Sequence, residues 1–107
     1  KFSIIYSEDV LVFLNSLADK AKAKILYNIN RSKYILDKKI FKKLENSEIW
    51  EFRTLYNGVQ YRVFAVWDND IDTLVITTHG IIKKTQKTPK KEIEKAESIR
   101  KEYFKNK

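Results

Sequence analysis

The chain has 107 residues, of which 43% are hydrophobic, and its 22 basic residues outnumber 14 acidic residues to give a net charge of +8. This length suits one domain spanning residues 1–107, and the apolar content excludes a disordered chain. Cysteine is absent and histidine occurs once, which excludes disulfides, thiolate nucleophiles and metal sites built from cysteine or several histidines.

Charge and composition also indicate where the protein acts. An excess of basic residues favours a polyanionic partner such as RNA, DNA, an anionic membrane or an acidic protein, although many lysine-rich proteins bind none of these. No apolar run approaches the roughly 18 residues of a membrane-spanning helix, and no signal peptide is visible. Because missing cysteines also fit a reducing compartment, we expect a cytoplasmic protein that does not enter a membrane.

The N-terminal part of the chain predicts a short strand followed by a helical hairpin. Phe2–Tyr6 has the composition of a strand, and Ser7 is a typical helix N-cap. The apolar face of the first helix consists of Val10, Phe13, Leu14 and Leu17. Asp19 is a candidate cap for the second helix, whose stripe extends from Ala18 to Leu36.

The central part predicts a three-stranded antiparallel meander. Residues Lys38–Asn46 form a basic connector, after which the pattern changes to the alternation of strands. The expected strands are Glu48–Tyr56, Val59–Trp67 and Ile71–His79. Asn57-Gly58 is a strong hairpin signal, and Asp68-Asn69-Asp70 is expected to form the next turn.

The C-terminal part predicts a basic loop and a last helix. The loop is Gly80–Lys87, and in Thr88-Pro89 the threonine suits an N-cap and the proline the first helical position. Ile93, Ala96, Ile99, Tyr103 and Phe104 give this helix an apolar side. The resulting order, βααβββα, predicts an α+β fold in which the helices cover an antiparallel sheet.

Four polar residues interrupt the apolar strands and form the candidate site: Glu51, Arg53, Arg62 and His79. Alternate residues of a strand share a face, so Glu51 lies beside Arg53, and Val75, Thr77 and His79 line up together. If the four meet on one face, arginines can bind a phosphate while a carboxylate or imidazole moves the proton of an RNA 2′-hydroxyl. Such chemistry requires no metal and no other cofactor.

Each of these residues also has a structural interpretation. Arg53 and Arg62 could lie on a solvated face or pair with Glu51, and His79 could stabilise a turn beside Gly80. The lysines of the connector and the loop could hold RNA or only face solvent. They are Lys42, Lys43, Lys83, Lys84 and Lys87. Trp50 and Trp67 are expected in the core.

Several segments together resemble the RelE/HigB toxin superfamily, most of all its phage-derived branch. These segments are Glu48–Arg53, Tyr61–Phe64, Thr78–Lys84 and Thr85–Pro89. The resemblance covers nearly the whole chain and implies a microbial-RNase-like fold. It also implies an endoribonuclease that cuts mRNA on the ribosome, leaves a cyclic phosphate and a 5′-hydroxyl, and thereby inhibits translation.

The resemblance assigns roles to individual residues. Arg62 matches the arginine that the superfamily assigns to the scissile phosphate, and Arg53 matches a basic residue on the preceding strand. Lys84 falls near a basic residue that follows the last strand. Glu51 stands where RelE carries a lysine, and His79 has no fixed counterpart in every branch, so the acid and the base stay open.

The resemblance further implies a partner and leaves other functions open. A helix-turn-helix antitoxin from the adjacent gene is expected to bind the toxin and repress the shared operon. ParE-like relatives of the same fold poison DNA gyrase by protein–protein binding, and function does not follow from fold. A third possibility is a module that pairs with an antitoxin without catalysis.

Overall fold

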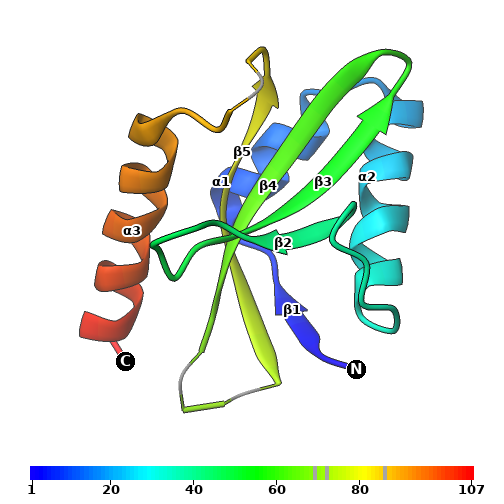
Figure 1. The fold of residues 1–107 in the computed structure, drawn as a ribbon. Helices are drawn as coiled ribbons and strands as arrows, with labels where there is room; N and C mark the ends of the chain where they lie inside the picture. The colour runs from blue at the N-terminus through cyan, green and yellow to red at the C-terminus, as the bar shows by residue number, and fades with distance from the viewer. Residues whose placement is uncertain (69, 72, 86) are drawn as a thin grey trace.

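A computed structural model describes residues 1–68, 70–71, 73–85 and 87–107, and within them it contains three helices and five strands (Figure 1). The N-terminal elements are β1 (Ser3–Ile5), α1 (Glu8–Asn15), α2 (Asp19–Ser32) and β2 (Phe41–Lys43). They are followed by β3 (Trp50–Tyr56), β4 (Val59–Trp67), β5 (Leu74–Lys83) and α3 (Lys90–Lys105). The predicted α+β fold class is confirmed.

The strands form one mixed sheet in the order β1-β5-β4-β3-β2. The meander β3-β4-β5 is antiparallel as predicted, and Asn57 and Gly58 have the positive φ angles that their hairpin turn requires. Two features differ from the expected antiparallel sheet. β1 pairs with β5 in parallel, and the predicted connector contains β2, whose three residues are too few to show a strand period.

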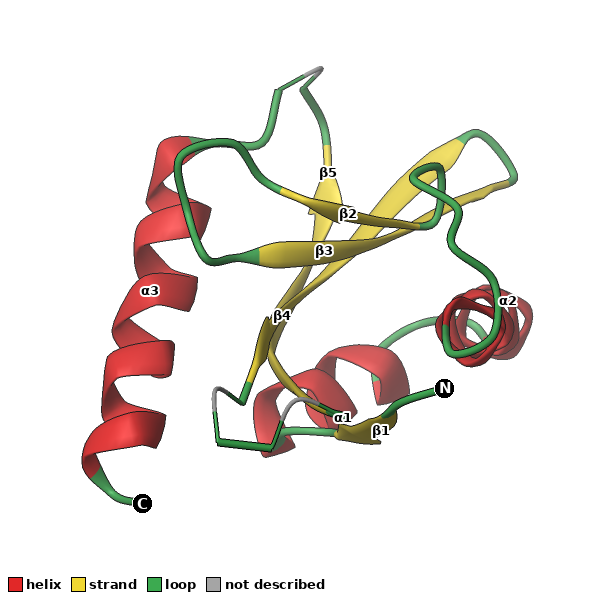
Figure 2. Ribbon diagram, turned by 60° about the horizontal axis from the view of Figure 1, so that its bottom comes forward, coloured by secondary structure: helices red, strands yellow, loops and turns green. Residues whose placement is uncertain are grey.

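Helices cover both faces of the sheet (Figure 2). α1 and α2 pack on one face, where Val10, Leu14, Ile25 and Ile29 join residues such as Phe52 and Val63 in the larger core. Trp50 and Trp67 pack against this core, as predicted. α3 packs on the opposite face through Ala96, against a second core of Ile49, Phe64, Val66 and Ile76.

Several predicted boundaries are shifted. Ser7 caps α1 as expected, but the residue at the N-cap of α2 is Ala18 rather than Asp19. α2 ends at Ser32, whose hydroxyl donates to the Asn28 carbonyl, and the predicted stripe residue Leu36 is fully exposed. Pro89 is the N-cap of α3, so Thr88 is not its cap. Parts of the predicted turns, strand and loop, at 69, 72 and 86, lie outside the described residues.

β5 contains a bulge that reverses the direction of its later side chains. Ala65 pairs with Thr77 and Val63 pairs with Gly80, so Phe64 alone stands opposite Thr78 and His79. Thr77 therefore faces α1, whereas His79 faces α3 and its ring packs 4.8 Å from that of Phe64. The predicted alignment of Val75, Thr77 and His79 is wrong for this reason.

The bulge also sets how closely α1 approaches the sheet. It turns Gly80 toward α1, and a Cβ atom at this position would overlap the ring of Phe13. Because only glycine avoids this overlap, Gly80 lets Phe13 lie directly on the strand. β5 then continues to Lys83, so the first half of the predicted loop Gly80–Lys87 is in fact strand.

The C-terminal end of α3 is held against the end of β4 by Asp68, which is fully buried. Its carboxylate accepts hydrogen bonds from Lys107 Nζ at 2.7 Å and from the Tyr103 hydroxyl at 2.6 Å. The backbone N–H groups of Asp70 and Ile71 donate to the same carboxylate. These donors, Lys107 first, hold the pKa of Asp68 well below its usual range.

We predict that Asp68→Asn destabilises the fold in a pH-dependent way. A carboxyl whose pKa is lowered by folding stabilises the protein above its unfolded pKa of about 3.8, and this contribution disappears as the pH falls below that value. Urea unfolding across a pH series should show a large difference between the proteins at neutral pH that shrinks in acid. Asp70→Asn, at a residue 76% exposed, is the control and should change little. A pH-independent difference for Asp68→Asn would contradict this role.

Candidate functional site

A polar cluster occupies the part of the α3-facing sheet surface that lies beyond the second core. The register pairs Lys42 with Glu51, Arg53 with Arg62, and Gln60 with Lys83. Because paired residues share a face, the three strand pairs bring these six side chains to one side of the sheet. The sequence-predicted residues Glu51, Arg53 and Arg62 therefore do meet.

A buried ion pair forms the centre of the cluster. Arg62 Nε lies 2.9 Å from Glu51 Oε1, and the two side chains are only 4% and 3% exposed. The contact is an ion pair, and within the described residues neither of these two atoms has a further hydrogen-bond partner. The Thr88 hydroxyl donates weakly to the other carboxylate oxygen, at 3.4 Å. The charges attract, yet the pair retains unused hydrogen-bonding capacity.

The guanidinium of Arg62 is fixed by its neighbours on β4. Nη1 donates to the Tyr61 carbonyl at 3.0 Å, and Nη2 donates to Gln60 Oε1 at 2.8 Å. Burial lowers the pKa of Arg62, an effect that the charge of Glu51 opposes. Each terminal nitrogen still carries a second N–H, so the fork can bind an anion without leaving its place.

Among the described residues, the side chain of Arg53 makes fewer hydrogen bonds than that of Arg62. Its Nη1 donates to the Lys38 carbonyl at 3.3 Å, while its Nε is buried without a hydrogen-bond partner among the described residues. Lys42 lies across from Glu51 and is exposed. Lys43, the next residue, pairs with Trp50 and so belongs to the opposite face. Of the two connector lysines, only Lys42 joins the cluster.

The bulge in β5 decides which of two adjacent lysines reaches the cluster. Lys83 is 9% exposed, and burial, with repulsion from Arg62, lowers its pKa. Lys84 follows the strand, is exposed, and lies against a hollow beside Gly58 and Thr85, which Lys83 also lines. The resemblance assigned a role to Lys84, whereas of these two lysines it is Lys83 that lies in the cluster with Glu51.

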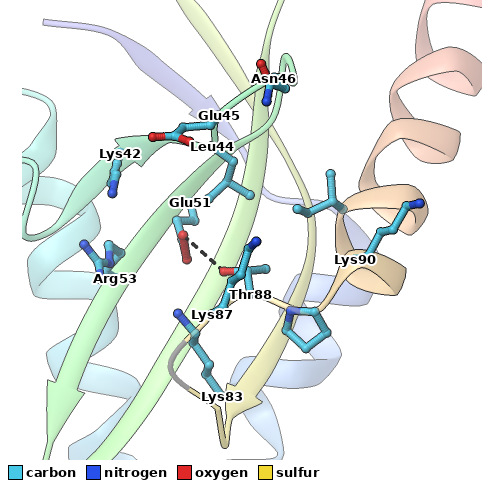
Figure 3. A pocket seen from close by; sticks show the side chains of 12 residues that line it. Lys42, Leu44, Glu45, Asn46, Glu51, Arg53, Lys83, Lys87, Thr88 and Lys90 are labelled. Carbon is cyan, nitrogen blue, oxygen red and sulfur yellow. Dashed lines mark hydrogen bonds between the residues drawn. The ribbon is translucent and has the colours of Figure 1, made fainter.

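These residues line an open pocket of about 690 Å³ between β3 and the start of α3 (Figure 3). Its basic lining residues are Lys42, Arg53, Lys83, Lys87 and Lys90, and its acidic ones are Glu45 and Glu51. Arg62 does not line this pocket, but it contacts the lining residue Glu51. The pocket therefore carries an excess of positive charge around one buried carboxylate, which suits a phosphate group.

His79 lies on the same sheet face but outside the pocket lining. Its Nε2 is 3.0 Å from Glu92 Oε1 in the first turn of α3, and its Nδ1 is 3.1 Å from the Thr78 hydroxyl. Burial lowers the pKa of His79, although the hydrogen bond to Glu92 opposes this effect. With both nitrogens engaged, His79 attaches α3 to the sheet and thereby fixes the wall of the pocket.

Sequence reasoning missed three contributors to the site: Thr88, Gln60 and Lys90. Thr88 was interpreted as a helix cap, and Gln60 and Lys90 are ordinary surface residue types with no distinguishing pattern. The exchange of Lys84 for Lys83 did have a signal. Thr77-Thr78 breaks the alternation of β5 just before His79 and Gly80, and a glycine inside a strand often marks a bulge.

Two further features of the chain limit the type of site. Within the described residues, no three side chains of the His, Asp and Glu types gather where they could hold a metal ion. Across the same part of the chain, each helix is too short or too polar to cross a membrane.

Comparison with known protein families identifies a relationship over most of the chain. The model of a family described as phage-derived protein Gp49-like matches residues 12–101. The chain belongs to this family. Gp49-like proteins are associated with the toxins of toxin–antitoxin pairs, and this association suggests an antitoxin partner. A search of curated proteins found no match.

We predict that the two partners of the buried ion pair are unequal in their effect on stability. Glu51→Gln leaves Arg62, Arg53 and Lys83 without their carboxylate and should cost about 3 kcal/mol or more. Arg62→Gln should cost less, because Arg53 and Lys83 remain beside Glu51. Denaturant unfolding measures both losses.

Added phosphate separates this explanation from a simple packing defect. An anion that replaces the missing carboxylate should stabilise Glu51→Gln more than the unchanged protein. Equal losses for the two variants, with no selective stabilisation by phosphate, would show that the cluster is not dominated by positive charge.

Proposed function

We propose that this Gp49-like protein is the toxin of a toxin–antitoxin pair and acts as an endoribonuclease that cuts mRNA on the ribosome. The observation that carries the proposal is the buried carboxylate of Glu51, which lies among arginines and a lysine in an open, positively charged pocket. RNA cleavage needs a proton acceptor, a proton donor and cations around one phosphate, and this cluster contains all three.

In the proposed reaction, Arg53 and Arg62 bind the scissile phosphate and hold the adjacent 2′-hydroxyl in line with the leaving oxygen. The planar fork of an arginine matches two phosphate oxygens, and these contacts strengthen as negative charge builds up in the transition state. The terminal nitrogens of Arg62 each keep one N–H beyond their bonds to Tyr61 and Gln60, and these are the donors for this purpose.

Two side chains carry the protons. Glu51 accepts the proton of the 2′-hydroxyl while the 2′-oxygen forms its bond to phosphorus. Thr88 orients the Glu51 carboxylate. Lys83 donates a proton to the departing 5′-oxygen as the P–O bond breaks, which leaves a 2′,3′-cyclic phosphate and a 5′-hydroxyl. A lysine whose pKa is lowered by burial gives up its proton more readily, so it suits this step.

The remaining residues support binding and position. Lys42, Lys87 and Lys90 at the rim of the pocket attract the RNA backbone, and His79 positions α3 through Glu92. Because its nitrogens are engaged, His79 is a weaker candidate for proton transfer than Glu51 or Lys83. In the cytoplasm, a helix-turn-helix antitoxin from the adjacent gene would bind the sheet face that carries these basic residues and thereby block the pocket.

Adjacent lysines provide a matched test of the proposed acid. Lys83→Ala should lower the single-turnover rate of mRNA cleavage on programmed ribosomes about a hundredfold or more, as expected for the loss of one transition-state donor. Lys84→Ala removes the same charge one residue away and should cleave at nearly the normal rate. Unfolding curves of both variants verify that they are folded.

Two outcomes would contradict the assignment. If Lys84→Ala loses as much activity as Lys83→Ala, the side-chain directions after the bulge do not govern the chemistry. If the unchanged protein stops growth but never cuts mRNA on ribosomes, the nuclease proposal fails and a ParE-like action on gyrase takes its place.

A further inference from the structure

A second basic pocket, of about 510 Å³, lies on the α2 side of the cluster. Its basic lining residues are Lys24, Arg31, Lys39, Arg53 and Arg62. Among the described residues that line it, Asp37 is the one acid, and its carboxylate is already engaged by the backbone N–H of Lys39. Five cations against one partly engaged carboxylate make this pocket attractive to an anion.

The pocket exists because β2 is short. β2 pairs only with the first residues of β3 and begins opposite Phe52, and the Arg53 N–H donates to the carbonyl of Ile40, the residue before β2. Beyond that point, in the described part of the chain, α2 rather than another strand lies beside the edge of β3. The hydrogen bond from Asn28 to Thr54, 3.1 Å long, fixes α2 there and sets the floor of the pocket.

Helical spacing directs the charges of α2 into this pocket. Lys24, Asn28 and Arg31 are separated by four and three residues, so they share one face of the helix. Lys24 Nζ also lies 5.1 Å from the centre of the Tyr27 ring, and Tyr27 is 59% exposed. A cation beside an exposed aromatic ring is a combination that binds single-stranded nucleic acid, because bases stack on the ring while phosphates contact the cation.

The two pockets meet at the proposed reaction centre. We call the second pocket the α2-side pocket and the first, between β3 and the start of α3, the α3-side pocket. Arg53 lines both, Arg62 lines the α2-side pocket, and Glu51 lines the α3-side pocket. The buried Glu51–Arg62 pair thus stands between two separate groups of cations. A ligand with one charge would occupy one pocket, whereas a chain of phosphates that crosses the pair would contact both.

We infer that the α2-side pocket is a second phosphate subsite, which binds the RNA strand on one side of the scissile phosphate. This inference rests on the proposed function, because it describes the path that the RNA substrate takes across the proposed site. The strand passes along Lys24 and Arg31, crosses Arg53 where it is cut, and leaves over Lys83 and Lys87. The second group of cations thereby holds the strand in line for cleavage.

The test compares two pairs of substitutions on α2 and its C-cap residue, Lys33. Lys24→Ala/Arg31→Ala removes two charges that line the pocket, and Lys20→Ala/Lys33→Ala removes two charges that do not. Binding is measured across a salt series with single-stranded RNA whose 2′-hydroxyls are methylated, so that it cannot be cut. A dinucleotide, with one phosphodiester, serves as the short ligand.

The pocket pair should reduce the salt dependence of binding the longer RNA by about 1.4 units of log–log slope, the value for two lost contacts to a single strand. The control pair should reduce it much less, and neither pair should affect the dinucleotide. Equal losses from both pairs, or an equal loss with the dinucleotide, would overturn the subsite while leaving the nuclease intact. If the unchanged protein binds neither RNA, the subsite inference fails, whereas the proposed function is decided separately by cleavage on programmed ribosomes.

Discussion

Strand β5 has one residue more than β4 between the Ala65–Thr77 and Val63–Gly80 pairs, and every side chain that follows changes face because of it. Three features depend on this bulge. Gly80 turns toward α1 and admits the ring of Phe13, His79 turns toward α3 and pairs with Glu92, and Lys83 turns into the pocket. The position of two helices and the composition of the site thus follow from a single inserted residue.

The charges of the site are costly for the fold. Glu51, Arg62 and Lys83 are all at least nine-tenths buried, and burial disfavours the charged form of each side chain type. Glu51 partly offsets the repulsion among the cations, but one carboxylate does not balance them. An anion in the pocket would complete the balance, which is why the same arrangement that weakens the free protein favours phosphate binding.

The anchoring of α3 keeps the pocket in shape without filling it. The first turn of α3 is held by His79 through Glu92, and the C-terminal end of α3 is held by Asp68 through Tyr103 and Lys107. Between these anchors, Ala96 packs on the second core, so the helix covers the apolar half of the sheet face. The polar half stays open, and it is there that the proposed RNA strand would bind.

Much of the fold could be predicted from the sequence, and the site only in part. Periodicity and turn residues predicted the meander, the helical hairpin and the last helix, and alternation placed Glu51 and Arg53 on one face, which Arg62 joins through its pairing with Arg53. Pattern reasoning failed where structure depends on contacts distant in sequence. β2 is too short to show a period, the end of α2 depends on Ser32, and the bulge that selects Lys83 over Lys84 is a property of the pairing with β4.

The central claim is that the cluster around Glu51 directs an RNA 2′-hydroxyl to attack the neighbouring phosphate. The most direct measurement is cleavage of an mRNA on programmed ribosomes with a single 2′-deoxynucleotide at the mapped cut site. We predict that cleavage at that bond disappears, while the unmodified mRNA is cut and ends in a cyclic phosphate. Cleavage of the deoxy-substituted bond at the normal rate would contradict the claim, because the nucleophile would then come from elsewhere.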